Sequence, residues 1–297
     1  AYIYVRNGST WTQQQKIVAS DRATGDHFGW SVAISGDHAI VGAYIEDEDA
    51  SGGNTASDAG SAYIYVRNGS TWTQQQKIVA SDRAIEDWFG STVAISGDYA
   101  IVGADAEDED TSGGNTLSLA GSAYIFFRNG TTWIQQQKIV ASDRAPVDRF
   151  GGSVAISGDH AIVGAYAEDE DASGGNTTLN SGSAYIFARD DTTWTQQHKI
   201  VASDRAMHDW FGYPVAIGGD YAIIGAYGED EDIWGTNTLN AAGSAYLFAI
   251  RHSITLNVAI WLDGPYNTGT LLMDDGLRTA GLIPAAEPYT ALGFTNA

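Results

Sequence analysis

The chain has 297 residues, with 37 acidic against 15 basic residues and a formal net charge of −22, which argues against nucleic acid as a partner because contact with phosphates needs a basic surface. Hydrophobic residues make up 43% of the sequence, as in globular proteins, and no apolar run reaches the roughly 18 residues of a membrane helix. Cysteine is absent, which excludes disulfides and thiolate metal sites.

The sequence repeats itself with a period of 61 residues. The segment that begins at Ala1 returns at Ala62, Ala123 and Ala184, and its first strand begins once more at Ala245. A fixed period of this kind indicates a repeat architecture, in which one supersecondary unit stacks on the next. We therefore predict a repeat domain over residues 1–250 and a non-repeating C-terminal segment over 251–297, which serves in assembly or begins a second domain.

Each period contains four short strand-like segments and no helical periodicity. Residues 1–18 supply one strand pair, and the first full set of strands is predicted at 31–34, 39–42, 62–67 and 72–79. Gly36-Asp37 and Asn68-Gly69 are hairpin turn signals between them. Four antiparallel strands per period are typical of a propeller blade. The sequence therefore predicts an all-β protein, a β-propeller with four to five blades in this chain and a short β segment after it.

The alternation of strand direction sorts the loops onto two faces. With the strands of a blade named a to d in chain order, the a–b and c–d turns share one face. The acidic b–c loop, which begins at Glu46, shares the other face with the d–a segment that contains Asp21 and Arg22.

The two ends of the repeat region do not complete a blade. Full sets of strands are predicted over 28–79, 89–140 and 150–201, the fourth set has three strands within 215–250, and residues 254–262 are a candidate for its missing strand. The strand pair in residues 1–18 is left over. Because an unpaired strand edge is a template for association, we expect the protein to associate with itself through these terminal strands.

One set of motifs resembles a known repeat. Phe28-Gly29, the strand 31–34 and Val41-Gly42-Ala43 recur in order in all four repeats, and together they resemble the FG-GAP repeat of integrin-α-type β-propellers. The Trp-x-Gln-Gln-x-Lys run that recurs with them is similar to a bacterial variant of this repeat. The resemblance covers residues 1–250 and implies an extracellular propeller used in adhesion or assembly. The C-terminal segment is similar to a recurrent segment of secreted Bacteroidota proteins, which implies export or a cell-surface location.

The resemblance does not supply a calcium site at the family's own position. Integrin-type repeats carry a calcium loop between strands a and b, and this sequence has only the turn Gly36-Asp37 there. The acidic b–c loops have calcium-like spacing instead, with oxygen-bearing residues at positions 1, 3 and 5 and glycine at position 6. The candidate ligands are Asp47, Asp49, Ser51 and Asp58, then Asp108, Asp110 and Ser112, then Asp169, Asp171 and Ser173, and finally Asp230 and Asp232.

A second interpretation of the acidic loops stays open. Runs of acidic residues usually form solvated loops, and an arginine recurs in each d–a segment as a counter-ion: Arg22, Arg83, Arg144 and Arg205. The sequence thus predicts either bound Ca²⁺ or an arginine-paired, solvated loop.

Two other repeated features have a structural and a functional interpretation. Asn7, Asn68, Asn129 and Asn176 begin glycosylation sequons, although Asn-Gly at the first three is also a preferred hairpin turn.

The repeated tryptophans Trp11, Trp72, Trp133 and Trp194 begin strand d in each repeat, where packing between blades is favoured over stacking on sugars. Trp30, Trp88, Trp210 and Trp234 are taken to lie outside the repeat register, as surface contacts.

These features favour a binding or structural protein over an enzyme. A site that recurs four times does not suit catalysis at one centre, and the six histidines include no repeated pair at ligand spacing. We predict an extracellular or cell-surface structural and adhesive protein, a subunit of a surface assembly or filament, stabilised by calcium. The alternative is a carbohydrate-binding propeller. Besides a second copy, the expected partner is a glycan or a surface protein.

Overall fold

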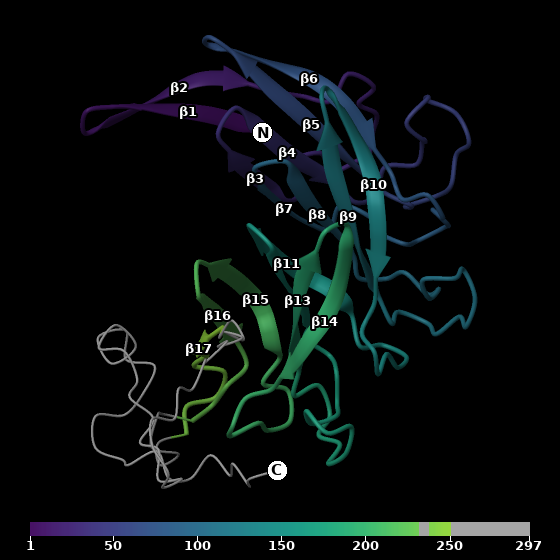
Figure 1. Cartoon of the computed structure of the whole chain (residues 1–297), viewed down its shortest axis with the longest axis vertical. Coiled ribbons are helices and arrows are strands. Elements are labelled where there is room, and N and C mark those ends of the chain that lie inside the picture. The colour runs from purple at the N-terminus through teal and green to yellow at the C-terminus, as the bar shows by residue number, and fades with distance from the viewer. Residues whose placement is uncertain (232–237, 251–297) are drawn as a thin grey trace, which may run out of the picture. The chain divides into compact units, whose positions relative to one another are not determined.

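The computed structural model describes residues 1–231 and 238–250, which contain seventeen β-strands and no helix. The strands form antiparallel sheets that follow one another along the chain (Figure 1). The predicted all-β class is thereby confirmed. Nothing in this part of the chain is a helix long and apolar enough to cross a bilayer.

Three of the sheets are complete four-stranded blades with their strands in chain order. The first blade contains β3 (Val32–Ser35), β4 (His38–Ala43), β5 (Ser61–Asn68) and β6 (Thr71–Ile78). The second contains β7 (Thr92–Ser96), β8 (Tyr99–Ala104), β9 (Ser122–Asn129) and β10 (Thr132–Ile139). The third contains β11 (Phe150–Ser157), β12 (His160–Ala165), β13 (Ser183–Asp190) and β14 (Thr193–Ile200). The four-strand period predicted from the sequence is confirmed.

Two partial sheets flank these blades. β1 (Tyr2–Asn7) pairs with β2 (Thr10–Lys16), and β15 (Phe211–Gly218), β16 (Tyr221–Ala226) and β17 (Ser244–Ala249) form a three-stranded sheet. Within the described residues these two sheets do not pair with each other. The candidate strand at 254–262 and the whole segment 251–297 lie outside the described residues.

The first strand of each blade lies beside the first strand of the next. β3 packs against β7, β7 against β11, and β11 against β15, as their positions in Figure 1 show. The backbone N–H of Gly97 donates to the Ser35 hydroxyl at 3.2 Å, although 62 positions separate the two residues in sequence. This is the arrangement of a β-propeller near its axis.

The hairpin turns are two residues long, and one of them falls one position later than predicted. Gly36 and Asp37 turn between β3 and β4 as expected. Between β5 and β6, Asn68 is still paired with Thr71, so the turn consists of Gly69 and Ser70. The physical reason is that this type of turn needs a positive φ at its first loop position, and Gly69 has a φ of 63°.

The Phe-Gly and Gly-Ala motifs form the joint between neighbouring blades. A Cβ atom on Gly42 would lie 2.0 Å from the backbone oxygen of Gly90 in the next blade. Gly90 itself has a φ of 93°, and a Cβ there would lie 2.3 Å from the backbone oxygen of Ser61. The adjacent Phe89 is fully buried and forms a β-bridge with Gly60. Only glycine lets the two backbones approach so closely, and the motif therefore fixes how blades stack.

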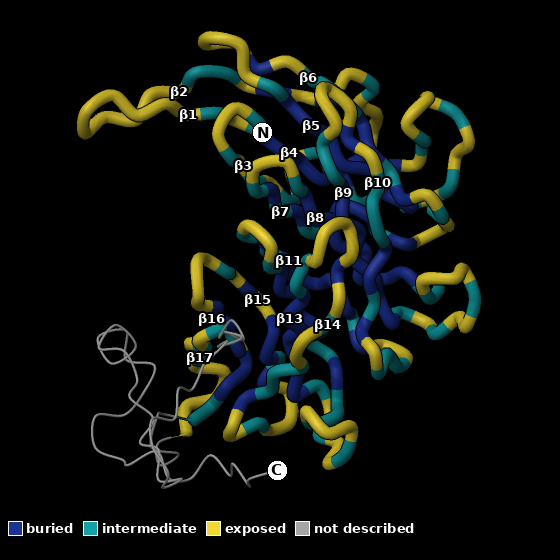
Figure 2. Tube along the Cα trace, in the orientation of Figure 1, coloured by how far each residue is buried: buried dark blue, intermediate teal, exposed yellow. Residues whose placement is uncertain are grey.

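The repeated tryptophans of the outer strands pack between blades. Trp72, Trp133 and Trp194 are at most 4% exposed. Each indole N–H donates to a glutamine of the preceding blade, as Trp133 Nε1 does to Gln75 Oε1 at 3.2 Å. For these three residues the prediction of packing is confirmed. The second strand of each complete blade is buried over most of its length, while the hairpin turns are exposed (Figure 2).

Candidate functional site at the blade axis

Three positions beside each blade joint carry different residues in different blades. The residue before Phe-Gly is His27, Trp88, Arg149 or Trp210; the residue after it is Trp30, Ser91, Gly152 or Tyr213; the residue after Gly-Ala is Tyr44, Asp105, Tyr166 or Tyr227. Each of these positions is next to a Phe-Gly or Gly-Ala motif, which fixes the backbone of the blade joint. A different residue at such a position therefore changes the side chain at the axis and leaves the joint unchanged.

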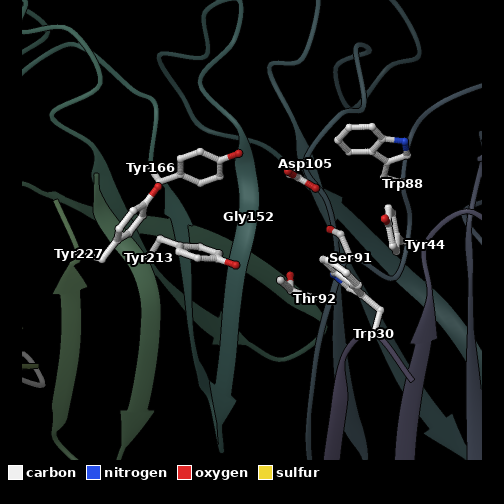
Figure 3. A pocket seen from close by; sticks show the side chains of 10 residues that line it. All are labelled: Trp30, Tyr44, Trp88, Ser91, Thr92, Asp105, Gly152, Tyr166, Tyr213 and Tyr227. Atoms are coloured by element: carbon white, nitrogen blue, oxygen red, sulfur yellow. The ribbon is translucent and has the colours of Figure 1, made fainter. Parts of the chain in front are cut away.

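All of these residues except His27, Arg149 and Trp210 line one cavity, which we call the axial pocket (Figure 3). They come from four consecutive sheets, beginning with Trp30 before β3 and ending with Tyr227 after β16. The cavity has a volume of about 350 Å³. Small-molecule sites in proteins occupy roughly 300–1,000 Å³, and this pocket therefore has the size for a small ligand or one end of a larger one.

One wall of the pocket is formed by Trp30, Tyr44 and Trp88. The ring centroids of Trp30 and Tyr44 are 4.7 Å apart, and Trp88 lies edge-on to Tyr44 at 6.0 Å. Trp30 is 61% exposed. Its ring is therefore supported by a neighbouring ring and remains accessible to a ligand.

The facing wall is formed by Tyr166, Tyr213 and Tyr227. Tyr213 lies 5.4 Å from Tyr166 and 5.8 Å from Tyr227 between ring centroids, and Trp210 stacks on Tyr227 at 4.6 Å. Figure 3 shows this group on the opposite side of the cavity from Trp30 and Trp88. Burial raises the pKa of the Tyr166 and Tyr227 hydroxyls, so both groups stay protonated and able to donate a hydrogen bond.

The floor between the walls is polar. Asp105 is 8% exposed, and its Oδ2 atom lies 3.8 Å from Arg149 Nη1. The Arg149 guanidinium also lies over the Trp88 ring, 5.3 Å from the centroid. Burial raises the pKa of Asp105, while Ser91 and Arg149 oppose that rise. The separation of 3.8 Å exceeds a hydrogen bond, so the Asp105 carboxyl keeps capacity to bond a ligand.

This arrangement has the chemistry of a binding site. Its rings offer apolar surface, and its floor offers the Asp105 carboxyl and the hydroxyl groups of Ser91 and Thr92, the mixture that small-ligand sites use. Among the described residues that line it, Asp105 is the single acid. Glycoside chemistry uses two carboxyl groups, and this pocket does not offer that pair.

The first three acidic b–c loops are each bound by an arginine from the following d–a segment. Arg144 donates from Nη2 to the backbone oxygen of Asp108 at 2.6 Å and from Nη1 to that of Asn115 at 2.7 Å. Arg83 and Arg205 make the same bonds in their own blades. The b–c loop and the d–a segment therefore share a face, as predicted. The arginine, however, binds backbone oxygens of the loop rather than its carboxylates.

The carboxylates proposed as calcium ligands bond to their own loop. Asp110 accepts hydrogen bonds from the backbone N–H and the hydroxyl of Ser112, at 2.8 and 2.6 Å, and from the Asn115 amide. Asp108 accepts the backbone N–H of Leu119 at 2.7 Å. The Ser112 hydroxyl and the loop amides hold the pKa of Asp110 below its usual value, and the same bonds recur around Asp49 and Asp171.

The first acid of each loop is buried and belongs to the blade interior. Glu107 is 2% exposed, accepts the Ser122 hydroxyl at 2.5 Å and lies 2.6 Å from Lys138 Nζ. Lys138 also lies 2.8 Å from Asp82 of the preceding d–a segment. The equivalent triads in the other complete blades are Lys77 with Asp21 and Glu46, and Lys199 with Asp143 and Glu168.

In the described residues, the close groups of three acidic side chains do not include the predicted calcium ligands. Three acidic side chains come within 4.8 Å of one another at two places there, Asp21-Glu46-Glu48 and Asp143-Glu168-Glu170. Neither group contains a predicted ligand, and in each a lysine already pairs with two of the acids. Arginine binding is thus observed at the loops that begin at Glu46, Glu107 and Glu168, and calcium binding there stays a prediction. Asp232 lies outside the described residues.

The repeat unit matches the family model described as the FG-GAP repeat four times, over residues 11–65, 72–126, 133–187 and 194–248. The chain belongs to the FG-GAP repeat family. Each match runs from the outer strand of one blade to the third strand of the next, so the FG-GAP unit contains the blade joint. No curated protein matches the chain.

The pocket residues flank the motif that defines the FG-GAP repeat, and sequence reasoning missed them. Trp88 and Trp210, taken above to lie out of register, are two periods apart and occupy the same position of their blades. Trp30 follows the Phe-Gly motif directly. Alignment of the four FG-GAP repeats carries the signal, because it separates the identical motif residues from the varying ones beside them. Trp234 lies outside the described residues.

The sequon asparagines lie at exposed sites of the FG-GAP repeats. Asn7, Asn68 and Asn129 are the last residues of β1, β5 and β9, on the face opposite the acidic loops. Asn176 is exposed in the third acidic loop, where its amide donates to Asp171 Oδ2 at 2.6 Å. Glycosylation at these four residues stays a prediction.

Proposed function

We propose that this FG-GAP repeat protein is an extracellular adhesive protein that binds its ligand in the axial pocket. The observation that carries the proposal is the convergence of blade-to-blade differences on one cavity. If the residues at the axis only held the blades together, the same residue would serve in every blade, as glycine does at the joints. A single asymmetric ligand needs different groups around it, and Trp30, Asp105, Gly152 and Tyr213 supply them.

The extracellular location has separate support. FG-GAP repeats are common in extracellular and cell-surface proteins, and this chain belongs to that family. The net charge of −22 favours solubility of a protein that presents exposed aromatic rings.

Adhesion through the pocket is tested with beads coated with the full chain and exposed to immobilised glycans, polysaccharides and matrix proteins. Beads that carry Trp30→Ala should lose retention, whereas beads that carry Trp11→Ala should not. The two tryptophans are matched, at 61% and 63% exposed, and only Trp30 lines the pocket. Equal retention of both variants would contradict the proposal.

A second candidate function is a structural subunit of a surface assembly or filament. Val32 and Ile34 are 60% and 58% exposed in the first complete blade, while their counterparts Val93 and Ile95 are 8% and 7% exposed. At the other end Ile223 is 47% exposed. These surfaces resemble those that blades bury against one another, which favours a second copy as the partner that covers them.

Self-association is tested by sedimentation of the full chain across a range of concentrations, with electron microscopy for filaments. Ile34→Glu should lower the association constant, because it places a charge on the apolar surface. Exclusively monomeric protein at all concentrations would exclude the structural role. Calcium stabilisation of the acidic loops also stays a proposal, and its test is given in the Discussion.

A further inference from the structure

We propose that the ligand of the axial pocket is a neutral pyranose sugar, held between the two aromatic walls with its hydroxyl groups on the Asp105 floor. This inference deepens the adhesive function proposed above and rests on it. It is tested separately from self-association, because Ile34→Glu changes no residue that lines the pocket.

The walls suit a flat ligand with apolar faces. Trp30, Tyr213 and Tyr227 are 61%, 42% and 46% exposed and lie in two groups on opposite sides of the cavity (Figure 3). A pyranose ring presents C–H groups on its faces, which pack against aromatic rings, and hydroxyl groups around its edge. A slot between rings therefore binds the faces and leaves the edge directed at the floor and at the solvent.

The floor suits hydroxyl groups. The Asp105 carboxyl accepts hydrogen bonds, and the 3.8 Å between its Oδ2 atom and Arg149 Nη1 leaves it with free capacity. The Ser91 hydroxyl lies on the same floor. A sugar hydroxyl both donates and accepts, and can therefore bond to the Asp105 carboxyl and the Ser91 hydroxyl together. Hydrogen bonds are directional, and this floor thus orients the ring.

The surroundings disfavour two other kinds of ligand, cations and acidic sugars. A cation cannot stack on the face of Trp88 that Arg149 already covers, at 5.3 Å from the ring centroid. The closest rings are 4.7 Å apart in one wall and 5.4 Å apart in the other, which leaves no space for a cation between them. An acidic sugar would meet the Asp105 carboxyl and the field of a chain with a net charge of −22. A neutral sugar meets neither obstacle.

The test is a glycan array probed with the full-length chain, followed by calorimetric titration with the methyl glycosides of glucose, galactose, mannose and N-acetylglucosamine. Sialyllactose serves as the acidic comparator and tetramethylammonium as the cationic one. We expect binding of at least one neutral glycan, with the affinity lowered at least tenfold by Trp30→Ala and by Asp105→Asn. Trp11→Ala should leave the affinity within twofold, and each variant should keep the sedimentation profile of the unchanged protein.

Each outcome decides the inference. An array without a neutral glycan above background would overturn it, and so would stronger binding of sialyllactose or tetramethylammonium. Sugar binding that Trp30→Ala leaves unchanged would place the sugar site elsewhere and refute this pocket as its location. If bead adhesion depends on Trp30 but no glycan competes for it, the ligand class is wrong while the adhesive function stands.

Discussion

Replacement of Lys138 by methionine tests the buried triads most directly. The Lys138 side chain is 6% exposed, and its Nζ atom lies 2.8 Å from Asp82 and 2.6 Å from Glu107. Methionine keeps the apolar stem and removes the cation, which leaves Glu107 charged and buried. Loss of one partner of a buried ion pair costs about 3–5 kcal/mol. With a urea m-value of about 3 kcal/mol/M, the unfolding midpoint should fall by roughly 1–1.7 M.

The chain supplies its own control for this change. Lys16 occupies the same position in β2 but is exposed, with its Nζ atom 5.6 Å from the Tyr2 ring centroid. Lys16→Met should therefore change stability by no more than about 0.5 kcal/mol. Adding Glu107→Gln to Lys138→Met removes the uncompensated charge and should recover part of the loss. The assay is urea unfolding followed by tryptophan fluorescence. If Lys138→Met and Lys16→Met unfold at the same urea concentration, the triad does not stabilise the blade.

Three further predictions follow from other parts of the structure. Burial raises the pKa of Asp148 to about 7. The folded chain thus binds this proton more tightly than the unfolded chain, and the unchanged protein should lose stability as the pH rises from about 4 to 7. Asp148→Asn should remove part of that loss, so its melting temperature should exceed that of the unchanged protein at pH 8 but not at pH 4; an equal difference at both values would contradict the pKa. Gly151→Ala places a Cβ 2.3 Å from the backbone oxygen of Ser122 and should destabilise by more than about 3 kcal/mol, whereas Gly158→Ala meets open space and should cost only the about 1–2 kcal/mol of its positive φ. Both variants are compared by thermal unfolding, and an equal loss of stability in the two would contradict this reasoning. If calcium stabilises the acidic loops, millimolar Ca²⁺ should raise the melting temperature and excess EGTA should reverse the rise, and an unchanged melting temperature would end that proposal.

The strands and their hairpins could be predicted because their signals are local. Residues 31–34 and 39–42 are short β-branched runs, and the Gly36-Asp37 turn lies between them in both the sequence and the structure. The turn after β5 was predicted one residue early, because Asn-Gly reads as the turn itself, whereas Asn68 still pairs across to Thr71. An error of this size changes no blade.

The acidic run shows why composition alone was insufficient. Glu46, Asp47, Glu48 and Asp49 read as one solvated or calcium-binding cluster. In the structure Glu46 is buried against Lys77, whereas Asp49 bonds to its own loop. The difference arises from the blade packing, since Lys77 lies 31 residues away in sequence and reaches Glu46 only when β6 joins the sheet.

The sequence by itself determined the 61-residue period, the four strands of each blade and the face that carries the long loops, because turn glycines and alternating strands act over a few residues. Only the tertiary structure brings together in space the residues that differ from one repeat to the next. Trp30, Asp105 and Tyr213 are far apart in the chain and sit in different blades. They line one pocket because the joint glycines bring the inner strands of successive blades side by side, and that contact depends on the stacking of whole blades.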